Sequence, residues 1–348
     1  MNTTTLRGMR TACHYQRIRF GIAPRISSFG GRSQSLQLTS LLLFRYASTS
    51  TVSSNSKTVT SKAHPVNGPI TTLPAPLQTP TRQPSQSLPG YLFTLGKSYL
   101  AFYKTGIKNI YANYKASQPI QSTIDKKHTS SLVAAVKARS LNRSEFQLLT
   151  RNWHDVKRVP MFALVLIICG EFTPLVVIAM TSIVPWTCRI PKQIQSDRAK
   201  LEERRRISFR NLTAKVPEKQ GVEALNRMQL LHISWSLGLS SSAWDYLGGQ
   251  LPGLPTGMLR RKVKRRVEYL EMDDKLIERA GGVKDMDVEE VRMALVERGV
   301  DVLGKESKGL KVDLAAWLKS REKIPVERLL LTRPSVWPVK ASDVKVKL

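Results

Sequence analysis

Residues 159–184 read VPMFALVLIICGEFTPLVVIAMTSIV, and this stretch determines the predicted architecture. Its 26 residues contain a single charged side chain, Glu171. At about 1.5 Å per residue, a helix of this length crosses a hydrocarbon core of about 30 Å. The stretch therefore predicts one transmembrane helix, and the alternative is a buried helix of a soluble protein.

Glu171 lies at the middle of this stretch, where an ionised carboxylate costs about 2.5–3.5 kcal/mol or more. We therefore expect it to be protonated, paired or turned toward a cavity. Pro174 lacks an amide hydrogen and crowds the carbonyl of Gly170, so the helix should kink there. Together with the hydroxyl of Thr173, these groups predict an intramembrane ion or proton site that forms when several copies assemble as a homo-oligomer. The alternative is a neutral Glu171 that the kink or a neighbouring helix accommodates.

The charge of the chain is strongly positive and unevenly distributed. There are 55 Lys and Arg against 26 Asp and Glu, a net charge of +29, and residues 1–124 contain no acid. This excludes an enzyme with an acidic cytosolic surface and favours partners that carry phosphate, either nucleic acid or lipid headgroups. Cys13, Cys169 and Cys188 are too far apart in sequence to predict a disulfide framework or a zinc site, which favours a reducing compartment.

Residues 1–46 have the composition of a mitochondrial transit peptide, because seven arginines alternate with Ser, Thr and Leu without any acid. Arg45 lies two places before Ala47, so we expect the mature chain to begin there. The alternative is a disordered basic tail. Residues 47–90 are rich in Ser, Thr and Pro and are predicted to be a disordered linker.

Apolar residues recur at helical spacing in residues 91–158, which predicts amphipathic helices ahead of the membrane. The first covers 91–114, the second 132–137 and the third 146–156, with Ser144 as its cap.

Residues 185–337 are predicted to be a soluble helical domain, and residues 338–348 a basic tail. Seven Lys or Arg follow the apolar stretch within about twenty residues, against five that precede it. This bias favours the matrix side for the carboxyl-terminal domain.

One helix of this domain, around residues 258–270, is predicted to be strongly basic. Leu259, Val263, Val267 and Leu270 share one helical face. Six cations occupy the rest of the surface: Arg260, Arg261, Lys262, Lys264, Arg265 and Arg266. Their mutual repulsion favours contact with a polyanion, and a solvated basic face is the alternative. Since few aromatic residues are interleaved with them, such a surface would position a partner rather than read its sequence.

Residues 287–320 resemble a SAP-type module, a helical hairpin that binds nucleic acid. Asp287 and Glu290 suggest a capping box, and Arg298-Gly299 suggests a left-handed helix end. The alternative is that the apolar stripes of both helices are simply core.

Several segments, taken in order, resemble the LETM family of mitochondrial inner-membrane proteins over residues 91–337. Besides the apolar stretch with Glu171 and Pro174, they are Tyr103-Lys104-Thr105-Gly106, Leu141-Asn142-Arg143-Ser144-Glu145, Asp273-Asp274-Lys275-Leu276-Ile277, Val302-Leu303-Gly304, Trp317-Leu318 and Ile324-Pro325 leading to Leu329-Leu330-Leu331-Thr332-Arg333.

This resemblance implies a single-pass inner-membrane anchor and a matrix helical domain that binds the mitochondrial ribosome during membrane insertion of new proteins. It also implies potassium/proton or calcium/proton exchange, with the family's intramembrane Glu and Pro at Glu171 and Pro174. The chain has no sustained heptads and no EF-hand loop, so calcium regulation through such a loop is not expected.

No residue pattern predicts an enzyme, a cofactor or a metal site. The five histidines lack a spaced partner, and no phosphate-cradling glycine loop occurs. The sequence therefore predicts an all-α protein with one transmembrane helix and a helical domain that binds the mitochondrial ribosome, with inner-membrane lipids as further partners. Cation/proton exchange through Glu171 and nucleic-acid binding by residues 287–320 are the alternatives.

Overall fold

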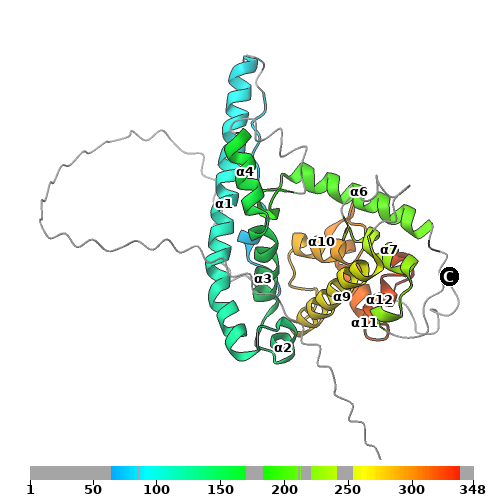
Figure 1. Cartoon of the computed structure of the whole chain (residues 1–348). Coiled ribbons are helices and arrows are strands. Elements are labelled where there is room, and N and C mark those ends of the chain that lie inside the picture. The colour runs from blue at the N-terminus through cyan, green and yellow to red at the C-terminus, as the bar shows by residue number, and fades with distance from the viewer. Residues whose placement is uncertain are drawn as a thin grey trace, which may run out of the picture. The chain divides into compact units, whose positions relative to one another are not determined.

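The computed structural model describes residues 64–82, 84, 87–169, 183–210, 212, 221–240 and 254–337. All of them belong to one of the two units into which the chain divides, residues 63–348. Every regular element in the described ranges is a helix, which confirms the all-α prediction for that part of the chain (Figure 1). The predicted transit peptide, most of the predicted linker and the basic tail lie outside the described residues.

The amino-terminal helices follow the predicted pattern, with longer or shifted ends. A short 3-10 helix, η1 (Ile70–Thr72), precedes α1 (Leu88–Lys127), which extends the predicted helix at both ends. The next helix, α2 (Leu132–Lys137), has the predicted bounds. It is followed by α3 (Arg143–Val156).

The start of α3 differs from the prediction. Asn142, rather than Ser144, is the cap, because its side chain accepts a hydrogen bond from the Glu145 amide while the Glu145 carboxylate accepts one from the Asn142 amide. This reciprocal pair satisfies two amide groups that the first turn leaves without a partner.

The apolar stretch is described only at its two ends. Helix α4 covers Val159–Cys169, and the chain is described again from residue 183. Glu171, Thr173 and Pro174 therefore lie outside the described residues. Within the described ranges, no helix combines the length and the apolar character that a membrane crossing requires.

The carboxyl-terminal helices pack around one large core. The elements are η3 (Trp186–Cys188), α6 (Pro191–Arg210), η4 (Val222–Ala224), α7 (Arg227–Ser236), α9 (Thr256–Arg279), α10 (Val288–Glu297), α11 (Ser307–Arg321), α12 (Val326–Leu329) and η5 (Pro334–Val336). Helix α9 carries the central apolar stripe, and Trp317 of α11 is fully buried in the same core.

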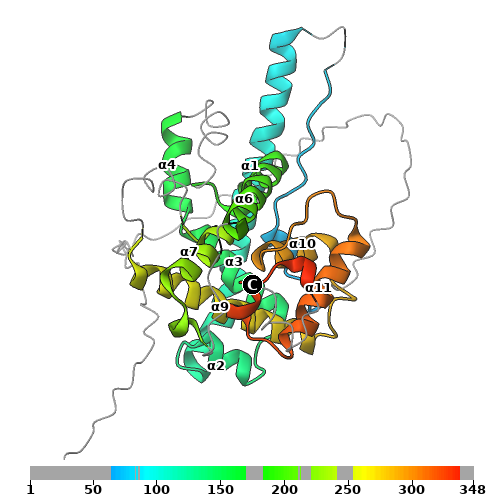
Figure 2. The ribbon, with the colours of Figure 1, turned by 90° about the vertical axis from the view of Figure 1, so that its right-hand side faces the viewer.

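Two smaller cores join the amino-terminal helices to this domain. In one, Ile124 of α1 and Phe146 of α3 pack with Leu276 of α9. In the other, Phe102 and Tyr103 of α1 pack with residues from both ends of the apolar stretch. The predicted regions 91–158 and 185–337 thus share cores in the described structure (Figure 2).

Candidate functional site

The predicted basic helix exists as the first half of α9, and its apolar face is buried as expected. Leu259, Val263, Val267 and Leu270 are all in the main core. This stripe fixes which way the six cations point, because each position on a helix is rotated by about 100° from the previous one.

The six cations do not share one surface. Arg260 and Lys264 lie beside Glu223, with nitrogen-to-oxygen distances of 3.4 and 3.9 Å. On another side of the helix, Lys262 donates a hydrogen bond to the carbonyl of Leu239. Of the six, Arg261, Lys264 and Arg265 are exposed.

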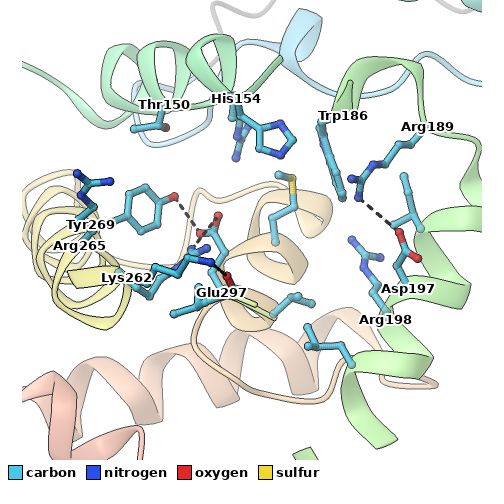
Figure 3. A pocket seen from close by; sticks show the side chains of 17 residues that line it. Thr150, His154, Trp186, Arg189, Asp197, Arg198, Lys262, Arg265, Tyr269 and Glu297 are labelled. Atoms are coloured by element: carbon cyan, nitrogen blue, oxygen red, sulfur yellow. Dashed lines mark hydrogen bonds and ion pairs between the residues drawn. The ribbon is translucent and has the colours of Figure 1, made fainter. Parts of the chain in front are cut away.

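Lys262, Arg265 and Arg266 line a pocket of about 580 Å³ between α3, η3, α6, α9 and α10 (Figure 3). Arg189 and Arg198 line it from the opposite side. These cations therefore reach this pocket from two segments that are far apart in the sequence, residues 189–198 and 262–266.

The acids at the pocket compensate these cations only in part. Arg189 lies 3.4 Å from Asp197, and Arg266 lies 4.0 Å from Glu297. Tyr269 donates a hydrogen bond of 2.9 Å to Glu297. Burial raises the pKa of Glu297 above its usual value, with Asp273 adding to the effect. Among the residues that line the pocket, the acids are Asp197 and Glu297, and the Lys and Arg side chains outnumber them.

Beneath this surface lies a buried network of ion pairs that the sequence did not predict. Asp273 of α9, fully buried, accepts hydrogen bonds of 2.8 Å from Arg143 of α3, from Arg298 and from Gln147. Burial alone would raise the pKa of Asp273, but Arg143 and Arg298 lower it well below its usual range.

The neighbouring acid, Asp274, joins α9 to α10 and α11. Arg298 donates to it at 2.6 Å, and the Trp317 indole and Arg321 donate to it at 3.1 Å. Each carboxylate oxygen of Asp274 therefore has a donor inside the core, which is what a buried charge requires.

Glu290 of α10 completes the network with α3. Arg151 holds it through two hydrogen bonds of 2.6 and 2.9 Å, and Arg143 lies 3.2 Å away. Burial would raise the pKa of Glu290, but Arg151 and Arg143 lower it. The network fixes α3 against α9 and α10, and so holds the basic surface of α9 in place.

Of the two sequence interpretations of the ends of α10, the structure contradicts the one at its start and confirms the one at its end. The structure shows no hydrogen bond from the Asp287 side chain to the start of α10, and Glu290 pairs with arginines, so the predicted capping box is wrong. Arg298 does precede a left-handed residue, since Gly299 has φ of +80°, but its side chain is buried in the network.

A signal for the network was present in the sequence. Asp273 and Asp274 continue the apolar stripe of α9 by one turn, from Leu270 to Ile277, so they had to face the core. Charged groups on a buried face need partners. Their partners come from positions as distant as Arg143, which no helical periodicity reveals.

The hairpin formed by α10 and α11 places its apolar stripes inside. Leu295, Leu310, Leu314 and Trp317 are buried in the main core, as the simpler interpretation of residues 287–320 predicts. Within the described ranges, no three His, Cys, Asp or Glu side chains are grouped so that they could hold a metal ion.

Comparison with known families gives two matches that overlap in α9. Residues 89–279 match the pentamidine resistance factor domain, and residues 250–336 match the LETM1-like RBD. The second match supports the resemblance to the LETM family. No curated protein and no solved structure matches the chain significantly.

Proposed function

The chain belongs to the family of the pentamidine resistance factor domain, and from this premise we propose that it is a mitochondrial inner-membrane protein that binds the mitochondrial ribosome. The match to the LETM1-like RBD over residues 250–336 supports this proposal, because α9, α10 and α11 lie within it.

The observation that carries the proposal is the exposed basic surface of α9. Arg261, Lys264 and Arg265 are exposed on a helix whose buried face is fixed by the main core and the ionic network. A preorganised group of cations binds phosphate backbones with little loss of conformational entropy on binding. Ribosomal RNA or an acidic ribosomal protein is the polyanion that we expect there.

The test is co-sedimentation of the full chain, in lipid nanodiscs, with purified mitochondrial ribosomes over a range of salt concentrations. The variant Arg261→Gln, Lys264→Gln, Arg265→Gln should bind at least about tenfold more weakly near physiological salt. The logarithm of its binding constant should also fall less steeply with the logarithm of the salt concentration. The slope should change by about one unit for each phosphate that the variant no longer neutralises.

A matched control removes the same charge elsewhere, through Lys308→Gln, Lys319→Gln, Lys323→Gln. These lysines are exposed on α11 or just after it. If the control loses binding and the α9 variant does not, the nucleic-acid-binding interpretation of residues 287–320 replaces the proposal. If neither variant nor the unchanged chain sediments, ribosome binding is wrong for this protein.

The full chain is necessary in this test because the described helices before the apolar stretch support α9. A fragment that begins after residue 184 lacks Arg143 and Arg151, the partners of Asp273 and Glu290. If such a fragment failed to bind, a missing binding residue and an unfolded domain would give the same result.

Membrane attachment is the second part of the proposal. The apolar stretch that begins with α4 has no charged residue in its first 12 positions, 159–170. Flotation of the chain with liposomes of inner-membrane composition tests attachment, and a chain that stays at the bottom of the gradient would exclude it.

Cation/proton exchange through Glu171 remains a separate proposal, which rests on the sequence alone. Glu171→Gln should abolish proton-coupled potassium or calcium flux in proteoliposomes while ribosome binding persists. Unchanged flux, or no flux in the unchanged chain, would leave the carboxyl without a transport role.

A further inference from the structure

The two ends of the apolar stretch meet in the folded chain. Asp155, at the end of α3, accepts a hydrogen bond of 2.6 Å from the backbone amide of Trp186, 31 residues later. The Thr187 amide donates to the same carboxylate at 3.3 Å. These bonds close a loop that leaves the fold at α4 and returns at η3.

Apolar contacts reinforce this closure. Phe162, in the first turn of α4, belongs to the same buried cluster as Val184 and Cys188 on the returning chain. Tyr103 of α1 belongs to this cluster too, with its ring centroid 6.1 Å from that of Phe162. The chain thus departs and returns over the same surface of α1.

This closure is incompatible with a one-way crossing of a bilayer. A crossing separates the ends of the segment by about 30 Å, the thickness of the hydrocarbon core. Helix α4 has 11 residues and rises about 16 Å, roughly half of that thickness.

The ionic network also requires the two flanks of the apolar stretch to lie on the same side of a bilayer. Arg143 and Arg151 precede the apolar stretch, whereas Asp273 and Glu290 follow it. Their side chains are buried against each other, so the network cannot exist with a bilayer between them.

The surface that extends away from the cores is apolar and exposed. The far end of α4 is exposed, with Ile167 and Ile168 at 81 % and 72 %, and α4 has no charged residue. The first half of α1, with exposed Leu92 and Phe93, projects in the same direction as α4 in both views (Figures 1 and 2).

Aromatic and basic residues surround the base of this projection. Lys157 lies over the ring of Trp153 at 4.3 Å, and Arg189 lies over the ring of Trp186 at 5.3 Å. Tryptophan and basic side chains are enriched where a protein meets lipid headgroups. Here they lie on both the departing and the returning chain, which places both at one interface.

We propose that α1–α3 and α6–α12 lie on the same side of the bilayer and face one compartment, because both flanks of the apolar stretch are joined to each other. This inference rests on the membrane attachment proposed above and excludes a single pass between the two flanks. Its partner is one leaflet of a lipid bilayer, which holds α4 and the first half of α1.

Paired cysteines on the two flanks test the proposal one molecule at a time. In a chain with Cys13→Ser and Cys169→Ser, the exposed residues Lys115 of α1 and Lys308 of α11 are changed by Lys115→Cys and Lys308→Cys. Cys188 can stay, because it is fully buried and burial raises the pKa of its thiol to about 12. The chain is reconstituted in sealed vesicles and treated with a bulky, membrane-impermeant maleimide.

Flanks on the same side of the bilayer give each molecule either two maleimide additions or none, whatever the mixture of orientations in the vesicles. A single pass gives one addition on every molecule and would overturn the inference. The control pair Lys308→Cys, Lys319→Cys, both on α11, defines the same-side pattern, and detergent should convert all variants to two additions. A chain that does not float with the vesicles would instead refute membrane attachment, and with it this inference.

Discussion

Arg143 of α3 and Asp273 of α9 form an ion pair of 2.8 Å although they are 130 residues apart in the chain. Their side chains are 1 % and 0 % exposed. Removing one partner from a buried pair leaves a charge without compensation, which costs more than the pair itself contributes. The pair therefore allows sharp predictions about stability.

Asp273→Asn should destabilise the chain by about 3–5 kcal/mol, because it leaves Arg143 and Arg298 buried with too little negative charge. Denaturant unfolding of the detergent-solubilised chain measures this change. Glu322→Gln, an exposed acid after α11, is the control and should change stability by less than about 0.5 kcal/mol. Equal effects of the two substitutions would contradict a special role for the network.

The stability of the fold should fall in acid because of the carboxylates of Asp273 and Glu290. Their pKa values lie below the unfolded values of 3.8 and 4.5. Their stabilisation is complete above about pH 5 and is lost as the pH falls through those unfolded values toward the lower folded ones. The melting temperature should therefore drop steeply below about pH 4.5, and Asp273→Asn should flatten that drop.

Glu297 should behave in the opposite way. Its pKa is raised by burial, so the folded state binds this proton more tightly than the unfolded chain does. Between the unfolded pKa, near 4.5, and the raised folded pKa, stability falls as pH rises. Glu297→Gln should remove this decline and leave the chain at least as stable at about pH 7. A clear loss of stability at neutral pH would show that the ionised carboxylate is the stabilising form.

Glu290→Gln distinguishes a network across the two flanks from a local effect on α10. In the full chain it removes the counter-charge of Arg151 and should cost about 3 kcal/mol. In a full chain that already carries Arg151→Gln, the same substitution should cost clearly less in denaturant unfolding, because the ion pair with α3 is already broken. An equal cost in both backgrounds would show that Arg151 of α3 is not the partner that stabilises Glu290.

Gly106 and Gly96 of α1 should respond to alanine with opposite signs. A Cβ on Gly106 would lie 2.6 Å from the Cys188 sulfur and 3.1 Å from the Thr187 carbonyl, so Gly106→Ala should cost about 1–3 kcal/mol. Nothing lies within 4 Å of a Cβ on Gly96, so Gly96→Ala should stabilise the helix by up to about 1 kcal/mol. Thermal unfolding of the two variants measures both, and a stabilising Gly106→Ala would mean that α1 does not pack on η3.

Periodicity predicted the helices well where apolar residues decide the buried face. The stripe of α9 and the bounds of α2 agree with expectation. Periodicity failed where a polar residue can have either of two structural roles. Glu290 fits a capping box as well as a buried ion pair, and only the position of Arg151 in space decides between them.

Several motifs that carry the family resemblance form long-range contacts in the structure, which their spacing in the sequence did not reveal. Arg143 and Asp273 belong to two of these motifs, and Gly106 belongs to a third. In the structure, Arg143 and Asp273 form the ion pair between the two flanks, and Gly106 is where α1 closely approaches η3. Such long-range interactions depend on the tertiary fold, which a local pattern does not specify.

The return of the chain at Asp155 and Trp186 also sets an order of events in folding. When the amino-terminal half is made first, the guanidinium groups of α3 have no buried counter-ion, because α9 follows more than a hundred residues later. Closing so long a loop is slow, since its entropy is given up before the ion pairs form. The apolar stretch lies inside that loop. With the membrane attachment proposed above, this stretch would enter lipid before the ion pairs form, and the ion pairs would then hold the surrounding helices together at the membrane surface.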